Sequence, residues 1–314
     1  MTEIMAGAHL TRATRARSFL FLCSVLISGV AAAQQPAMPP EYRDVLADLG
    51  LTGDYSDGVL KITLMRPDLS VSVAGRRAPA AFGFSGWLAF AKGDRNVDVM
   101  MGDLVLLEEE VNPVISALLA NGLEVTALHN HFLFEDPRVM YMHIHGMGDA
   151  GSLASDVKPA LDLIGRVRRP DAPPPRPALP LLRGNLNADR LNRIIGTTGT
   201  IIPPVYKVVV PRTDIEVRDM GALINARMGL NSWLAVFGSD DTAAVAGDIA
   251  MLEEEVTPVV KALRANDVEV AAIHHHMTGT RPVIIFLHYW GIGPAEGLAK
   301  GFRAALDELG SHRP

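Results

Sequence analysis

Short stretches that alternate apolar and polar residues occur throughout the first third of the chain. Residues 59–65, 69–74 and 86–91 each follow this pattern, which is typical of strands that bury one face. Residues 42–50 instead place two leucines on one side and end in Gly50, so they predict a short helix.

A longer helix is predicted to begin at Pro113. Asn112 offers a capping side chain just before this proline, whose missing N–H costs nothing in a first helical turn. Gly122 then provides the left-handed stop. By the same criteria, two strands around a turn at Pro137 and a closing helix are expected over residues 123–132, 138–146 and 153–164.

The whole pattern occurs twice, at an offset of 145 residues from Gly102 onward and of 146 residues at Trp87 and Trp233, which a one-residue gap between Trp87 and Gly102 explains. The acidic triplet 108–110 recurs at 253–255, and His129 recurs as His274. Matching strands are expected at residues 206–210, 215–219 and 233–237. A fixed-period match indicates a duplicated fold. We therefore predict an α+β protein, a tandem duplication of a β-β-β-α-β-β-α unit with mainly antiparallel sheets and helices on one face.

Two segments fall outside the repeats. Residues 166–185 are rich in proline and predict a stiff linker between a first repeat domain, 34–165, and a second, 186–314. Residues 1–33 have a basic head, an apolar run too short to span a bilayer and an alanine-rich end, as in a secretory signal peptide. We expect cleavage near Ala33 and an exported protein, periplasmic or secreted, with no transmembrane segment in the mature chain.

Composition narrows the classes of partner and ligand. Hydrophobic residues make up 48% of the chain and charged residues 20%, which excludes disorder for most of it. Loss of the signal segment would change the formal net charge from −6 to −8, so nucleic acid is an unsuitable partner. The single cysteine, Cys23, lies in that segment without the small preceding residue of a lipid-anchor site. The mature chain therefore has no disulfide and no thiolate ligand, and nothing in the sequence indicates an oligomeric state.

Histidines at strand spacing are the main candidate chemistry. Residues two apart on a strand share a face, so a hairpin centred on Pro137 would set His131 opposite His143 and His129 opposite His145. In the second copy the same reasoning sets His276 opposite His288, with His274 opposite Trp290 in the fourth place. Directly opposed side chains lie about 5 Å apart, which would bring these imidazoles within reach of one ion. The predicted metal ligands are His129, His131, His143, His145, His274, His276 and His288.

Zinc, copper(II) and nickel accept imidazole ligands, and zinc or copper is the expected ion. The nearest carboxylates by sequence are Glu109, Glu110, Glu254 and Glu255. Each is a candidate ligand, a partner to an imidazole N–H or a general base on a metal-bound water. The alternative for these glutamates is a solvated approach to a helix, and the alternative for the histidines is an inert hydrogen-bonded core.

Three segments of the chain point to a known family. These are the acidic triplet with its following helix, residues Ala127–His131 and residues Met142–Gly146. In these segments the chain resembles the bacterial LppY/LpqO family. That family consists of exported proteins and lipoproteins classed as a domain of unknown function. The resemblance extends over residues 41–310. It implies the segmentation and the export, and no activity, cofactor or catalytic residue.

Three functions are compatible with these patterns. The first is a transition-metal-binding protein, with metal-dependent hydrolysis as an extension in which His276 is essential. The second is a non-enzymatic module whose two halves bind a small molecule or peptide in a cleft, with histidines as hydrogen-bonding groups. The third is an envelope scaffold with neither metal nor pocket. A working site in the first copy, in the second, or shared by both remains open at this point.

Overall fold

The structure is a computed structural model that describes residues 37–167 and 177–310. The expected signal peptide, residues 1–33, and residues 168–176 of the expected linker lie outside the described residues. In the described part, no helix has both the length and the apolar character needed to cross a membrane.

The two halves contain the same principal elements in the same order. The first half comprises α1 (Pro40–Leu49), β1 (Gly53–Ser56), β2 (Val59–Met65), β3 (Ser72–Val73), β4 (Arg76–Arg77), β5 (Ser85–Lys92), β6 (Asp98–Leu107), α2 (Glu108–Ala120), β7 (Glu124–His129), β8 (Glu135–Asp136), β9 (Val139–Gly148) and α3 (Ala150–Leu163). The second comprises α4 (Ala188–Ile195), β10 (Thr200–Ile202), β11 (Val205–Pro211), β12 (Val217–Asp219), β13 (Ala222–Ile224), β14 (Asn231–Gly238), β15 (Ala243–Met251), α5 (Val256–Ala265), β16 (Glu269–His274), β17 (Ile285–Gly293) and α6 (Ala295–Asp307).

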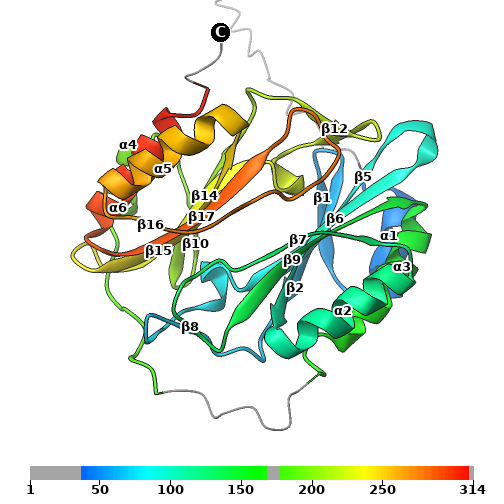
Figure 1. The fold of residues 1–314 in the computed structure, drawn as a ribbon, viewed down its shortest axis with the longest axis horizontal. Coiled ribbons are helices and arrows are strands. Elements are labelled where there is room, and N and C mark those ends of the chain that lie inside the picture. Colours follow the sequence, from blue (N-terminus) through cyan, green and yellow to red (C-terminus); the bar gives the residue numbers. More distant parts are fainter. Residues whose placement is uncertain (1–36, 168–176, 311–314) are drawn as a thin grey trace, which may run out of the picture. The chain divides into compact units, whose positions relative to one another are not determined.

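Each half forms one six-stranded antiparallel sheet. The strand orders are β1-β2-β5-β6-β9-β7 and β10-β11-β14-β15-β17-β16, which are equivalent strand for strand. One face of each sheet packs on helices: α1, α2 and α3 in the first half, α4, α5 and α6 in the second (Figure 1). The predicted α+β tandem duplication is confirmed.

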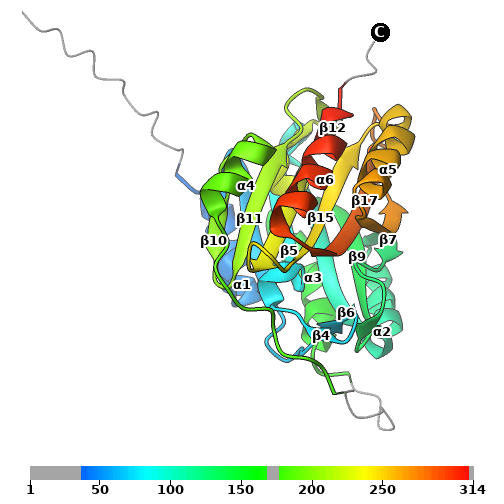
Figure 2. The same cartoon turned by 90° about the vertical axis from the view of Figure 1, so that its left-hand side faces the viewer.

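The opposite faces of the two sheets pack on each other. Two apolar clusters there contain residues of both halves: Ala89 and Met101 lie with Ile224 and Ala250 in one, and the other joins Phe82 to Phe237 and Ala244. Thr126 on β7 also donates a hydrogen bond of 2.6 Å to the carbonyl of His276. The layers run helices, sheet, sheet, helices (Figures 1 and 2).

Strands β6 and β15 were not among the predicted elements, and both lie inside their sheets. Nearly every residue of these strands is buried, because one face meets helices and the other meets the second sheet. A strand buried on both faces has no alternation of polar and apolar residues for the sequence to display. The strand expected at 69–74 shortens to Ser72–Val73.

The expected start of the central helix is also wrong. α2 begins at Glu108, five residues before Pro113, which lies inside the helix. Glu110 caps the first turn, because its carboxylate accepts a hydrogen bond of 2.8 Å from the backbone N–H of Leu107. Proline is tolerated early in a helix, where N–H groups have no intrahelical acceptor.

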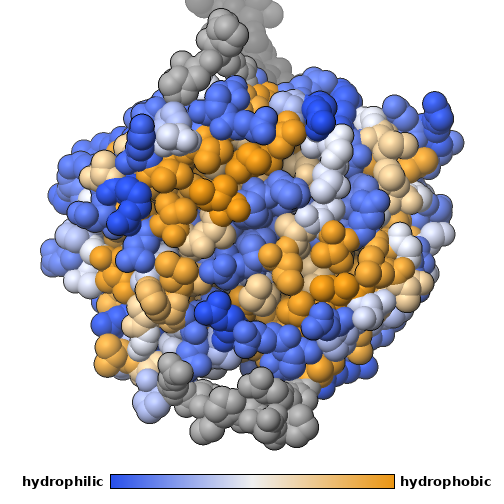
Figure 3. All heavy atoms as spheres, in the orientation of Figure 1, coloured by the Kyte–Doolittle hydropathy of each residue, from blue (hydrophilic) through white to orange (hydrophobic). Residues whose placement is uncertain are grey.

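The edge strands β7 and β16 expose apolar side chains at equivalent positions. Leu128 and Ile273 are 42% and 51% exposed. On the face seen in Figure 3, apolar areas lie over both halves with polar side chains between them.

Candidate metal centre

Six histidines from the two halves meet between the sheets. His129 ends β7, His143 lies on β9, and His131 follows β7 in the loop. Their equivalents at the offset of 145 residues are His274, His288 and His276. The ring centroids of His129 and His274 are 3.7 Å apart, those of His131 and His288 3.7 Å, and those of His143 and His276 3.8 Å.

These distances follow an approximate two-fold symmetry. The repeat offset exchanges His131 with His276 and His143 with His288, so the pairs at 3.7 Å and 3.8 Å are the same contact seen twice. The pair formed by His129 and His274 is its own equivalent. Every one of these close ring contacts joins one half to the other, so the cluster is shared and neither half holds it alone.

The expected hairpin register is wrong by four residues. His129 pairs with Tyr141 instead of His145, and Ala127, beyond a β-bulge, pairs with His143. The connection between β7 and β9 is not a tight turn, because it carries β8, which pairs with β3. A shift of four is even, so it preserves the face to which each side chain points. The same shift in the second half pairs His274 with Phe286.

The shift moves His145 away from the cluster. Its Nε2 lies 2.6 Å from a carboxylate oxygen of Asp219 on β12, and its Nδ1 lies 3.4 Å from Glu124. Burial alone would lower the pKa of His145, but the hydrogen bond and charge of Asp219 raise it above its ordinary value. In the second half Trp290 occupies this position and packs among apolar side chains.

Burial holds the six clustered imidazoles in their neutral form. It lowers the pKa of His129 to about 4, and it lowers those of the other five as well, with further lowering from neighbouring histidines. The Nδ1 atom of His288 lies 3.2 Å from the carbonyl of Gly247, and that of His129 lies 3.3 Å from the carbonyl of Asn130. In these two neutral imidazoles the carbonyl accepts the Nδ1–H, so the free lone pair of His129 and of His288 is on Nε2.

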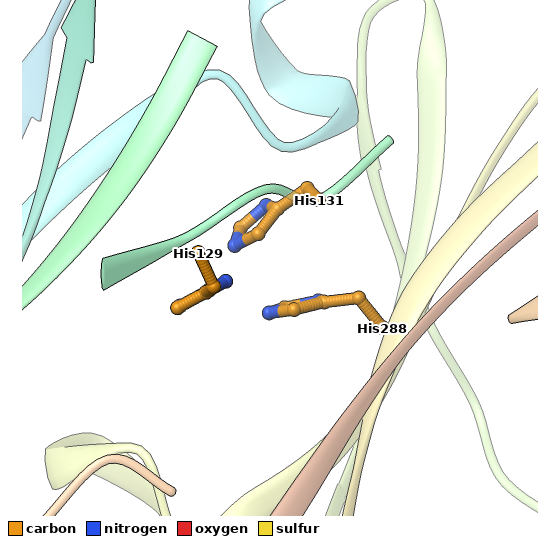
Figure 4. A group of neighbouring side chains, drawn as sticks. All are labelled: His129, His131 and His288. Carbon is orange, nitrogen blue, oxygen red and sulfur yellow. The ribbon is translucent and has the colours of Figure 1, made fainter. Parts of the chain in front are cut away.

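Several of the remaining ring nitrogens have no partner. Within the described residues, no hydrogen bond reaches Nε2 of His129, His143 and His288 or either ring nitrogen of His274. Buried polar atoms are rarely left in this state. In three groups, one ligand nitrogen from each of three histidines lies within 4.8 Å of the others: His129, His131 and His288; His129, His143 and His274; and His274, His276 and His288. Figure 4 shows the first group, which includes residues of both halves.

Two buried aspartates lie beside the histidines and were not predicted. Asp103 on β6 pairs with His143, and Asp248 on β15 pairs with His288. Burial raises the pKa of Asp103 to about 8, and burial followed by the charge of Asp103 raises that of Asp248. An oxygen of Asp248 lies 3.5 Å from Nε2 of His276. The available signal was the repetition of a Gly-Asp pair at the same offset inside two apolar runs.

A cavity of about 310 Å³ adjoins the cluster and is lined by both halves. His131, His276 and His288 face it, as do both aspartates. A larger cavity of about 630 Å³ lies between β2 and the end of α3. Its lining contains no histidine, so the smaller cavity is the one that belongs to the candidate site.

Of the four candidate glutamates, Glu110 and Glu255 pair with arginines instead of histidines. Glu110 is fully buried and forms an ion pair of 2.8 Å with Arg66, and Glu255 forms the equivalent pair, also 2.8 Å, with Arg212. Glu110 also accepts from the backbone N–H of Gly165 at 2.7 Å, which ties the start of α2 to the end of α3. Glu109 is half-buried and Glu254 is exposed.

One family model, described as Domain of Unknown Function (DUF1259), matches the chain twice, over residues 44–163 and 189–308. The chain belongs to this family. The two DUF1259 matches start 145 residues apart, which is the offset of the sequence repeat and of the equivalent histidines. No curated protein matches the chain.

Three solved structures show a weak likeness to the fold. EtuB from Clostridium kluyveri is 8% identical with a TM-score of 0.20, over 82% of this chain and 89% of its own. A fused permuted hexameric shell protein from the RMM microcompartment is 15% identical with a TM-score of 0.19, over 78% and 96%. The trimeric microcompartment shell protein PduB is 13% identical with a TM-score of 0.20, over 82% and 91%. At these TM-scores the likeness carries no argument about function.

Proposed function

We propose that the protein binds a transition metal, zinc or copper, at the six-histidine cluster. The observation that carries the proposal is the convergence of buried neutral imidazoles with unpartnered nitrogens from both halves. Leaving such nitrogens buried and unpaired costs free energy. A cation removes this cost, because zinc and copper take imidazole nitrogen as a ligand and require it to be neutral.

The proposed ligands are drawn from His129, His131, His143, His274, His276 and His288. Each of the three groups supplies three imidazoles, which leaves one position of a four-coordinate ion open. The backbone carbonyl acceptors at Nδ1 of His129 and His288 support this role, because metal-ligating imidazoles are usually oriented through their second nitrogen. His145 is not among the proposed ligands, since Asp219 and Glu124 occupy both of its nitrogens.

Export is part of the proposal. The basic head, apolar run and alanine-rich end of residues 1–33 support a signal peptide cleaved near Ala33, and the resemblance to the LppY/LpqO family supports the same destination. A site built from imidazole and carboxylate groups suits an oxidising compartment, because it contains no thiol.

Hydrolysis is the activity that this centre would support with one coordination position open to the cavity. A bound zinc ion lowers the pKa of a coordinated water and supplies a nucleophile near neutral pH. In this proposal Asp103 and Asp248, instead of the glutamates, are the groups that exchange protons with the reactants. They line the cavity beside the histidines, whereas Glu110 and Glu255 neutralise buried arginines.

The test is the metal content of the mature chain, from Gln34, purified without a histidine tag and measured by mass spectrometry. We expect near-stoichiometric zinc or copper in the unsubstituted protein and loss of it in His276→Ala. His275→Ala is the matched control, because His275 is adjacent but exposed. Absence of metal, even after incubation with zinc and copper salts, would contradict the proposal and favour the binding module, whose histidines only form hydrogen bonds.

A further inference from the structure

The cavity beside the cluster is built from equivalent residues of the two halves. Its lining includes three equivalent pairs: Lys61 and Lys207, Trp87 and Trp233, and Asp103 and Asp248. The approximate two-fold symmetry of the histidine cluster therefore extends into the cavity. Its lining contains charged side chains as well as the imidazoles of His131, His276 and His288.

The two lysines are half-buried, and each lies over a tryptophan ring. The ammonium of Lys61 lies 4.6 Å from the ring centre of Trp87, and that of Lys207 lies 4.4 Å from the ring centre of Trp233. Lys61 also donates to the carbonyl of Arg227 at 2.8 Å. Each ammonium is thus held over an indole face, which orients it without neutralising its charge.

These two cations share one cavity with Asp103 and Asp248, whose pKa values are raised by burial so that their carboxyl groups hold a proton at neutral pH. In the described residues neither ammonium has a carboxylate within ion-pair distance, and the two repel each other. Burial, followed by this repulsion, lowers the pKa of Lys61 to about 8, and burial lowers that of Lys207. Two like charges held in a partly enclosed space favour an anion between them.

A third donor points to the same chemistry. Arg227 lines the cavity, and its Nη2 is taken by Asp54 of the first half. Its buried Nε has no hydrogen-bond partner in the part of the chain that the structure describes. An oxyanion would satisfy this N–H together with the two ammonium groups.

We propose that the cavity binds a small oxyanion, a phosphate or a carboxylate, between Lys61 and Lys207. A volume of about 310 Å³ restricts the ligand to a small molecule. Among the described residues, Oδ1 of Asp103 and Oδ1 of Asp248 have no hydrogen-bond partner, which favours an anion that also carries a hydroxyl donor. Contact of this anion with a metal rests on the proposed function, whereas its retention by the lysines does not.

The experiment is isothermal titration calorimetry on the mature chain with two probes, inorganic phosphate and malonate. Each probe is titrated twice, into protein treated with chelator and into protein loaded with zinc. We expect saturable binding of at least one probe in chelator and a weakening of at least tenfold in Lys61→Met/Lys207→Met. The probe that binds more tightly identifies the ligand as a phosphate or a carboxylate.

Methionine preserves the length of the lysine stem, and the single variants Lys61→Met and Lys207→Met provide the same test if the double variant is unfolded. Lys300→Met is the control, because Lys300 is 59% exposed on α6 and outside the cavity. Failure of both probes to bind in either state, or unchanged affinity in the lysine variants, would overturn the inference. Anion binding by a protein that takes up no metal would overturn only the proposed function.

Discussion

The two halves are most alike at the histidine cluster and its cavity, and they differ elsewhere along the face where they meet. Inside, each half supplies three histidines, one aspartate, one lysine and one tryptophan at equivalent positions. Outside the cluster, His145 bonds to Asp219 of the other half, whereas its equivalent Trp290 packs in an apolar cluster. The shortest contacts between histidine rings join the two halves, and two of the three candidate ligand groups include residues of both. A duplicated site in which one copy had become purely structural would differ in the ligands first.

The largest expected effect is the drop in the free energy of unfolding when a buried ion pair is broken. This drop should be the same in both halves. Glu110→Ala removes the fully buried carboxylate that pairs with Arg66 and leaves this arginine, among the described carboxylates, only the more exposed Asp68. Glu255→Ala likewise leaves Arg212 only Asp214. Breaking a buried pair costs about 3–5 kcal/mol, so each variant should lose that much free energy of unfolding in urea denaturation. Glu109→Ala is the control and should change little. A loss below about 1 kcal/mol in either half would contradict this assignment.

The second prediction concerns the sharing of the metal site. Because His131 and His276 are equivalent, changing either to Ala should lower zinc affinity by a similar factor, at least about 100-fold or about 2.7 kcal/mol. Competition with a chromophoric chelator measures both affinities. A site confined to one half would instead give one sensitive variant and one indifferent variant.

Acid should destabilise the metal-free protein through the buried histidines. The folded-state pKa of His129 is about 4, below its ordinary value of 6.5, so between these pH values the unfolded chain holds a proton that the folded chain does not. The contribution of His129 to the free energy of unfolding is therefore constant above pH 6.5. Below it, this free energy falls by about 1.4 kcal/mol per pH unit as the pH drops toward 4.

His129→Gln isolates this effect. The difference in unfolding free energy between the unsubstituted protein and this variant should change with pH over that window, and the difference for the exposed His275→Gln should not. Asp103, whose pKa is raised from 3.8 to about 8, contributes the opposite slope between these two pH values. This slope overlaps the His129 window, but it is present in all three proteins and so cancels in the comparison. A pH-independent difference for His129→Gln would contradict the neutral cluster.

The smallest effect is expected outside the cluster. His145→Gln removes the ionic part of the contact with Asp219 while leaving a polar side chain, and we expect a loss of no more than about 1 kcal/mol. Metal content should remain that of the unsubstituted protein. Loss of metal in this variant would restore His145 to the ligand set predicted from sequence.

The sequence allowed prediction of the duplication and of the face of the strand to which each histidine points. The offset of 145 residues identified the duplication, and strand periodicity identified which histidines share a face. The register needed information that lies elsewhere in the chain, because β8 pairs with β3 and lengthens the connection after His131. The aspartates on β6 and β15 were hidden because strands buried on both faces show no alternation. The meeting of the three histidines of one half with the three of the other depends on how the two sheets pack. Local sequence patterns do not encode this packing.

Anomalous scattering from crystals of the zinc-loaded mature chain tests the shared centre most directly. We predict an anomalous peak between the sheets, about 2.0–2.1 Å from imidazole nitrogens that come from both halves. His131 or His276 should be among the ligands. A peak whose histidine ligands all come from one half, or no peak near the cluster, would contradict this prediction.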